Sequence, residues 1–170
     1  MLTAKNQDGT LITLPEKITR EALKLVKDHQ EFYCPCCESE LIIKAGDKKI
    51  PHFAHKKNPL CNASSEAESA YHLTGKRQLF NWLQKNQITA QLEAYLPEIK
   101  QRADILVTSN KGVYAVEFQC SIISVKDFVK RTALYLEIGV IPIWILAEKK
   151  LRKEQVNAFM LSAFHWQFLN

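Results

Sequence analysis

The stretch RADILVTSNKGVYAVEFQCS, residues 102–121, holds two apolar runs joined by a short polar turn. Both runs are rich in β-branched and aromatic residues, and the intervening NKG favours a hairpin turn. The pattern therefore predicts two antiparallel strands. Asp104, Glu117 and Gln119 interrupt these otherwise apolar runs. Because buried carboxylates are costly unless something neutralises them, the hairpin predicts a functional site as well as a fold.

A divalent cation is one way to neutralise this pair of carboxylates. Side chains alternate across a strand, so Glu117 and Gln119 share one face. Pairing through the turn would bring Asp104, on the partner strand, close to that end of the next strand. Hard oxygen ligands at this density suit Mg²⁺ or Mn²⁺. We therefore expect the hairpin to hold one of these ions through Asp104 and Glu117.

The remaining chain predicts further helices and strands around the hairpin. Helical apolar spacing predicts helices over 18–29, 66–86 and 124–139, and a short helix over 148–159. Strand-like runs lie at 88–96 and 140–147, in a hairpin over 1–14, and on both sides of the AGDKK turn at 45–49. We expect a β-rich module over residues 1–65 and a mixed α/β layer domain over 66–170, separated by a polar loop.

Cysteine and histidine cluster in the first module. Cys34 and Cys37 form a Cys-x2-Cys pair, and His52, His55 and Cys61 follow within 24 residues of Cys37. This pattern favours a structural, four-ligand zinc site, with four of the five residues as ligands. Cys34 and Cys37 are one pair; the second pair is His55 with Cys61 or His52 with His55. The segment carries little apolar material, so the metal would supply much of its folding free energy.

Other polar residues fall into three groups. Glu68, His72 and Lys76 are spaced four apart, so they stack on one helical face. In the first module, lysines including Lys56 and Lys57 could form a basic face for phosphates. Arg131 and Tyr135, four apart on the helix after the hairpin, could touch a DNA backbone. The alternative is an ordinary solvated surface for the first two groups and an ordinary amphipathic helix for Arg131 and Tyr135.

Composition limits the function classes. The net charge of +5 permits a polyanionic partner without requiring one. The longest apolar run, residues 140–147, is too short to span a bilayer, and the N-terminus has no apolar signal core. We expect a cytoplasmic protein with no membrane association and no small-molecule cofactor.

These residues together resemble the PD-(D/E)XK nuclease superfamily, whose fold is restriction-endonuclease-like. More narrowly, the chain is similar to the CoiA-like competence family over roughly residues 30–147. The stretches that carry the resemblance are YCPCC, LIIKAGDKKIPHFAHKKNPLC, ESAYHLTGK, RADILV, AVEFQCSIIS and RTALYLEIGVIPIWIL. Their order matches a zinc-finger-like module followed by a nuclease domain.

The resemblance implies a mixed sheet flanked by helices and a set of catalytic roles. Asp104 and Glu117 would hold the catalytic Mg²⁺ or Mn²⁺, and Glu68 would complete or support the metal site. His72 and Lys76 would face the same cleft, where Lys76 could orient water or hold a phosphate. Gln119 stands where many superfamily members have lysine, and Ala103 replaces the motif proline.

Three functions follow as hypotheses. The first is a metal-dependent DNA nuclease acting in DNA uptake or recombination, with recombination or competence proteins as further partners. The second, motivated by Gln119, is a weakly active or inactive DNA-binding accessory protein that keeps the nuclease fold as a scaffold. The third is a structural zinc protein that binds protein partners and carries Asp104 and Glu117 as surface polar groups.

Overall fold

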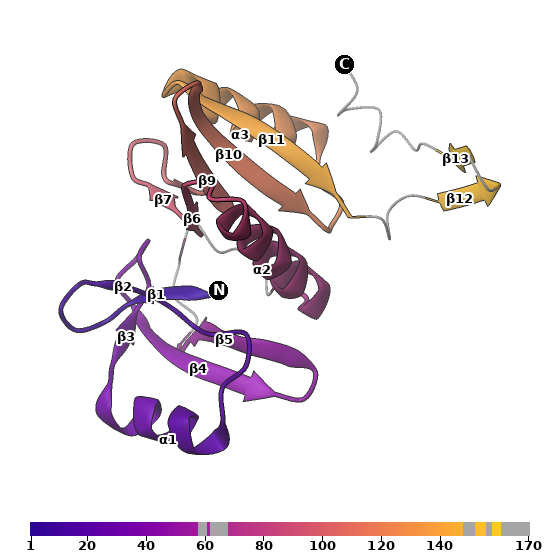
Figure 1. Cartoon of the computed structure of the whole chain (residues 1–170). Helices are drawn as coiled ribbons and strands as arrows, with labels where there is room; N and C mark the ends of the chain where they lie inside the picture. Colours follow the sequence, from indigo (N-terminus) through magenta and orange to yellow (C-terminus); the bar gives the residue numbers. More distant parts are fainter. Residues whose placement is uncertain (58–60, 62–67, 148–151, 156–157, 161–170) are drawn as a thin grey trace.

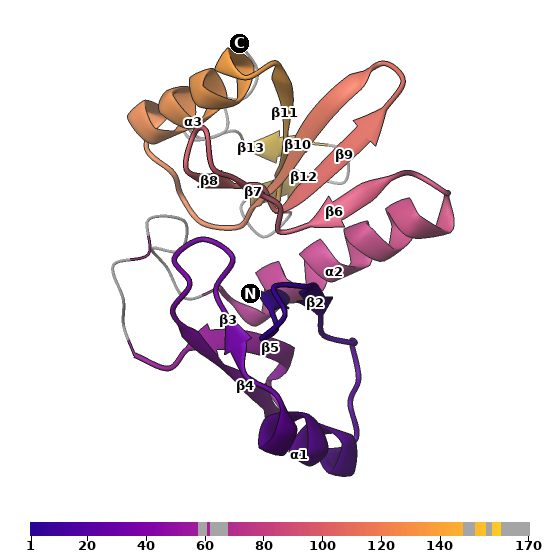
Figure 2. The same cartoon turned by 90° about the vertical axis from the view of Figure 1, so that its left-hand side faces the viewer.

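A long helix, α2 (Ala70–Lys85), separates two β-sheets in the fold. The arrangement comes from a computed structural model that describes residues 1–57, 61, 68–147, 152–155 and 158–160. Figure 1 shows the N-terminal sheet below α2 and the second sheet above it, and Figure 2 shows the same order from the side. No helix within the described ranges is long and apolar enough to cross a membrane.

The first sheet is antiparallel and has five strands in the order β2-β1-β3-β4-β5. Its strands are β1 (Thr3–Lys5), β2 (Leu11–Thr13), β3 (Phe32–Tyr33), β4 (Glu40–Gly46) and β5 (Lys49–His55). The two predicted hairpins, β1–β2 and β4–β5, are confirmed. The predicted first helix is α1 (Arg20–His29), and the Thr19 hydroxyl caps it by accepting the Ala22 N–H at 3.2 Å.

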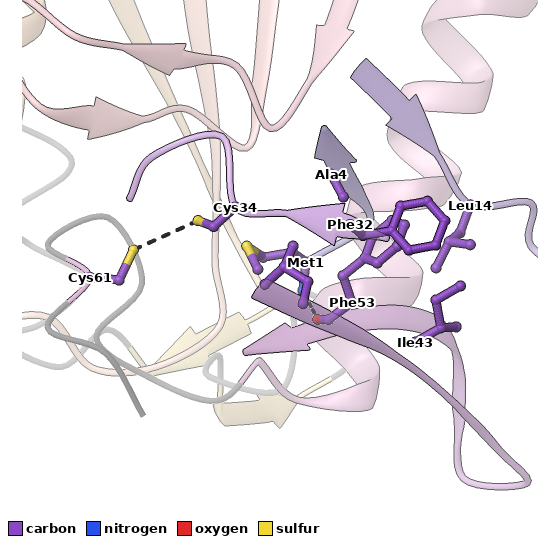
Figure 3. Close-up of a cluster of buried hydrophobic side chains, with 9 residues drawn as sticks. Met1, Ala4, Leu14, Phe32, Cys34, Ile43, Phe53 and Cys61 are labelled. Atoms are coloured by element: carbon purple, nitrogen blue, oxygen red, sulfur yellow. Dashed lines mark hydrogen bonds between the residues drawn. The ribbon is translucent and has the colours of Figure 1, made fainter. Parts of the chain in front are cut away.

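An apolar core of its own supports this first sheet. The rings of Phe32 and Phe53 pack with their centroids 4.9 Å apart, beside Met1, Leu14 and Ile43 (Figure 3). Cys34 and Cys61 extend the same buried cluster toward the loops. The module as a whole thus contains more core than its cysteine-rich segment alone indicates.

The second sheet has the order β11-β10-β9-β6 and is mixed, as the sequence predicts. Its strands are β6 (Ala90–Leu92), β9 (Ile105–Ser109), β10 (Gly112–Gln119) and β11 (Val140–Leu146). Strands β9 and β10 form the predicted antiparallel hairpin, whereas β10 and β11 are parallel and are joined through helix α3 (Val125–Glu137). The sheet lies between α2 and α3 (Figure 2).

Two predicted elements are wrong. The strand predicted over 88–96 is broken at Glu93, whose φ of 53° lies in the left-handed region, so β6 ends at Leu92. The short strand β7 (Tyr95–Leu96) then pairs with β8 (Gln101–Arg102). The helix predicted over 148–159 is also wrong in its described part, where β12 (Arg152–Gln155) pairs with β13 (Ala158–Met160). Local helix propensity is a weak prior that strand pairing overrides.

The helix α2 is buried on both sides, and it joins the two sheets. Leu73 and Leu83 pack with Ile105 and Val116 of the second sheet, and Leu2 from the N-terminus enters the same cluster. The Arg77 guanidinium donates a hydrogen bond of 2.5 Å to the Leu14 carbonyl. Residues from the first module therefore help to build the core under the predicted site.

Candidate functional site

Asp104 lies immediately before β9, and both of its carboxylate oxygens are engaged. Its Oδ2 accepts the backbone N–H of Phe118 at 2.9 Å and lies 3.0 Å from His72 Nε2. Its Oδ1 lies 3.3 Å from the Lys76 ammonium. The strand β10 and the helix α2 thus hold this carboxylate from two directions. Together with the burial of Glu117, this placement argues against the hypothesis that the hairpin acids are surface polar groups.

The predicted stripe Glu68, His72 and Lys76 faces Asp104. The Lys76 ammonium is fully buried and contacts the Glu68 carboxylate directly. Single ligand atoms from Glu68, His72 and Asp104 all lie within 4.8 Å of one another, which is close enough for one metal ion. Because Lys76 is buried, it does not reach a phosphate or a bulk water. The role of phosphate binding that the resemblance implies for Lys76 is therefore incompatible with this placement, and Lys76 neutralises carboxylates instead.

Glu93 is a functional residue that the sequence analysis missed. Its carboxylate is 1% exposed, and Oε1 lies 2.6 Å from the Lys76 ammonium. Its Oε2 accepts the backbone N–H groups of Leu2 and Thr3 at 2.7 and 2.9 Å, and the Thr3 hydroxyl at 2.9 Å. Glu93 therefore ties the first strand of the N-terminal module to the lysine in the site. The sequence signal for Glu93 was a carboxylate within the apolar run 88–96, the same kind of signal that indicated Asp104 and Glu117.

The three carboxylates of this cluster lie near three positive charges, those of Lys76, the N-terminal amine and Arg102. Burial is the largest single influence and by itself would raise the carboxyl pKa values. Lys76 outweighs it only together with the N-terminal amine and Arg102 at Glu68, and together with His72 and the Phe118 N–H at Asp104, so both pKa values lie well below their usual range. Lys76, the N-terminal amine and Arg102 similarly bring the pKa of Glu93 to about 2. The pKa of Lys76 is raised, because its three carboxylate neighbours outweigh its desolvation. All three carboxylates are consequently ionised around a charged lysine.

Glu117 points toward α3 rather than toward this cluster. Its Oε1 accepts hydrogen bonds from the Arg131 guanidinium at 2.7 Å and from the Tyr135 hydroxyl. Burial raises the pKa of Glu117 to about 7, with Arg131 opposing the rise and the charge of Asp104 adding to it. The charges of Asp104 and Glu117 therefore repel each other. Glu117 is nevertheless not among the metal-binding groups that lie within 4.8 Å of one another. The predicted Asp104–Glu117 ion site is not assembled in this arrangement.

Three further predicted residues take structural positions. Tyr135 is fully buried, so the prediction that it contacts DNA is incompatible with its placement. The Arg131 guanidinium already has partners within the protein, since it pairs with Glu117 and lies 5.4 Å from the centroid of the Trp144 ring. The Gln119 amide donates to the Ser121 carbonyl at 2.6 Å. The Gln119 side chain therefore bonds locally and carries no charge.

A second candidate metal centre lies in the N-terminal module. Ligand atoms of Cys34, Cys37, His55 and Cys61 all lie within 4.8 Å of one another, in a set that matches a tetrahedral Cys3His zinc site. Cys34 Sγ and Cys61 Sγ are 3.9 Å apart (Figure 3), and Cys37 Sγ is 3.4 Å from His55 Nε2. Of the two pairings that the spacing left open, the structure assembles His55 with Cys61.

His52, the fifth residue of the predicted cluster, and the neighbouring Cys36 both lie outside this ligand set. His52 is three positions from His55 on β5, so its side chain points to the opposite face, and its Nδ1 lies 2.9 Å from the Ile50 carbonyl. Hydrogen bonding with Cys36 lowers the pKa of the Cys34 thiol to about 4, although burial opposes this, and the same contact raises the pKa of Cys36. Cys34 is therefore the thiolate that a metal requires, and Cys36 keeps its proton.

Lys56 and Lys57, the predicted phosphate-binding residues, are both exposed on the N-terminal module. The Lys56 ammonium pairs with Glu40 at 2.6 Å. Both lysines line a groove that also includes Glu68.

Fold and site together define a two-part α/β protein that combines a thiol-rich candidate metal centre with a buried carboxylate–histidine cluster. Comparison with known families agrees. Residues 15–64 match the N-terminal domain of competence protein CoiA, and residues 68–170 match its nuclease-like domain. The chain therefore belongs to the CoiA competence protein family, as its motifs indicate.

One relative illustrates the similarity. The chain is 44% identical over 141 residues to the competence protein CoiA of Bacillus subtilis (strain 168). The aligned region covers 83% of this chain and 38% of that protein, so the chain spans well under half the length of this relative. No match was found among solved structures.

Proposed function

We propose that this chain is a metal-dependent deoxyribonuclease with a restriction-endonuclease-like PD-(D/E)XK fold, acting in DNA uptake or recombination. The observation that carries the proposal is the convergence of Glu68, His72 and Asp104 within 4.8 Å, beside the start of β9 in the second sheet. The match to a nuclease-like domain and the similarity to a competence protein support it. Competence or recombination proteins are its proposed partners, and the cytoplasm its proposed location.

The donor set fits a divalent cation. Carboxylate oxygens suit Mg²⁺ and Mn²⁺, and the imidazole nitrogen makes Mn²⁺ the better match. A bound ion would lower the pKa of a water ligand and stabilise charge on a phosphodiester in the transition state. His72, whose side chain is 20% exposed, forms the accessible edge of this cluster. Lys76 keeps Glu68 and Asp104 ionised and therefore ready to bind metal.

The N-terminal metal centre has a different proposed role. Cys34, Cys37, His55 and Cys61 would fill all four positions of a zinc ion, which leaves no position open for a substrate. We assign this centre to structural zinc that fixes the loop after β3 against the end of β5.

Cleavage of DNA tests the proposal directly. Wild type and Asp104→Asn are compared on linear, circular and single-stranded DNA in Mg²⁺ and in Mn²⁺, with Glu98→Gln, an exposed charge change, as the matched control. Wild type and the control should cut, whereas Asp104→Asn should lose all cleavage while retaining its circular dichroism spectrum. Equal cleavage by Asp104→Asn would assign the activity to another site or to a contaminant.

A second candidate function has its own supporting observations. Lys76 already neutralises the carboxylates, Glu117 is bonded to Arg131, and Gln119 adds no charge. These features fit a DNA-binding accessory protein that uses the nuclease fold as a scaffold. It predicts salt-dependent DNA binding with no cleavage in either metal. Cleavage that disappears in Asp104→Asn would exclude it.

A further inference from the structure

A concave, lysine-lined groove crosses the N-terminal module. It has a volume of about 1030 Å³ and is formed by the β4–β5 hairpin, one residue of α1 and the residue before the α2 cap. Its lining contains six lysines and only two acidic residues, Asp47 and Glu68. The lysines are Lys27, Lys44, Lys48, Lys49, Lys56 and Lys57.

Most of these positive charges have no acidic partner. Lys56 pairs with Glu40, and Lys49 donates to the Glu68 carbonyl at 2.6 Å. Among the residues that the structure describes, the ammonium groups of the other four lysines form no ion pair. A concave surface lined by one sign of charge raises the local concentration of an oppositely charged ligand. The groove is therefore built to attract a polyanion.

The groove ends at the candidate metal cluster. Glu68 lines the groove and, with His72 and Asp104, is also one of the three residues of that cluster. The hydrogen bond from Lys49 to the Glu68 carbonyl fixes the end of the groove to the beginning of α2. His52, which the spacing offered as a zinc ligand, lines the groove instead. A chain of phosphates that lies along the lysines would thus arrive at Glu68.

We propose that this groove is the nucleic-acid track of the protein, in which the lysines of β4–β5 bind the phosphodiester backbone and lead it to the Glu68 end of the cluster. A nucleic acid is the partner that fits best, because its repeated phosphates complement several ammonium groups without acidic partners in one groove. The inference deepens the proposed function and rests on it for the link to cleavage, but binding alone can test it.

The test compares two variants with the same change in charge. Lys44→Gln/Lys48→Gln removes two unpaired charges from the groove. Lys17→Gln/Lys24→Gln removes two exposed charges from the same module outside the groove. Binding to fluorescent duplex and single-stranded DNA of random sequence is measured by anisotropy between 50 and 200 mM salt, without added Mg²⁺ or Mn²⁺. Because all four lysines are exposed, both variants should keep the wild-type melting temperature.

The expected result is a loss of affinity in the groove variant alone. Each phosphate contact contributes about one unit to the slope of log affinity against log salt, so this slope should fall by about 2 in Lys44→Gln/Lys48→Gln. In an actively cutting protein, the same variant should raise KM and leave kcat unchanged. Equal binding by both variants would overturn the inference. A wild-type protein that binds no DNA would also overturn it. So would displacement of the labelled DNA by polyglutamate of equal charge as effectively as by unlabelled DNA, because the groove would then suit an acidic protein.

The experiments distinguish a refutation of the nucleic-acid groove from a refutation of the nuclease activity. Binding that depends on the groove lysines, without cleavage in either metal, would support the track and reject the nuclease. Cleavage that depends on Asp104 but not on the groove lysines would support the nuclease and reject the track.

Discussion

Replacement of Glu93 should have the largest effect of any single charge change in this protein. Glu93 is buried, contacts Lys76, and accepts three hydrogen bonds from Leu2 and Thr3. Glu93→Gln keeps the size and one oxygen acceptor but removes the charge that opposes Lys76. Glu93→Ala removes the acceptor as well. The two variants therefore separate the ion pair from the connection to the N-terminal strand.

The pKa of Glu93 sets the size of the effect. A fall from the ordinary value of 4.5 to about 2 corresponds to about 3 kcal/mol of stability at neutral pH. We expect Glu93→Gln to lose roughly this amount and Glu93→Ala about 3–5 kcal/mol, since Glu93→Ala removes one of the three carboxylates around Lys76 and leaves two buried N–H groups without an acceptor. The exposed control Glu98→Gln should change the free energy of unfolding by less than about 0.5 kcal/mol.

Urea denaturation measures these differences. Because the pKa of Glu93 is lowered in the folded state, its contribution is complete above pH 4.5 and is lost as the pH falls toward 2. The gap between wild type and Glu93→Gln should therefore shrink on acidification. A loss below about 1 kcal/mol at pH 7, or a gap that does not change with pH, would refute the view that Glu93 anchors Lys76.

Three further predictions follow from other contacts. The pKa of Glu117 is raised by burial, so its stabilising contribution is complete below pH 4.5 and is lost as the pH rises through about 7. In urea denaturation, the free energy of unfolding of Glu117→Gln should therefore rise by up to about 3 kcal/mol relative to wild type between pH 4.5 and pH 8. A difference that stays constant with pH would contradict this. Cys37→Ser should purify without zinc, as measured by mass spectrometry, and should have a lower melting temperature, whereas Cys36→Ser should keep the metal. Equal zinc content in the two variants would reject the ligand set. Gly75→Ala should cost about 1–3 kcal/mol despite the better helix propensity of alanine, because the added methyl would overlap the Phe118 ring; a more stable variant would show that the ring moves freely.

The sequence determined the features that depend on neighbouring residues. The hairpin of β9 and β10 follows from two strand-like runs and a turn, and the caps Thr19 and Ser124 stand where helices begin. His72 and Lys76 lie four apart on α2, as the helical spacing predicts, whereas Glu68 precedes the Ser69 cap and joins the same cluster from outside the helix. Such features have short-range causes, and so they can be recognised without the fold.

Only the tertiary structure decided which of these residues meet. His55 was separated from His52 by the face of β5 on which each side chain lies, and Glu117 was directed toward Arg131 by the crossover through α3. Glu93 required the strand β1, which is ninety residues distant in sequence, to supply the N–H groups that its carboxylate accepts. Burial and the pairing of charges depend on segments that are remote along the chain, and a local pattern carries no information about their distance in space.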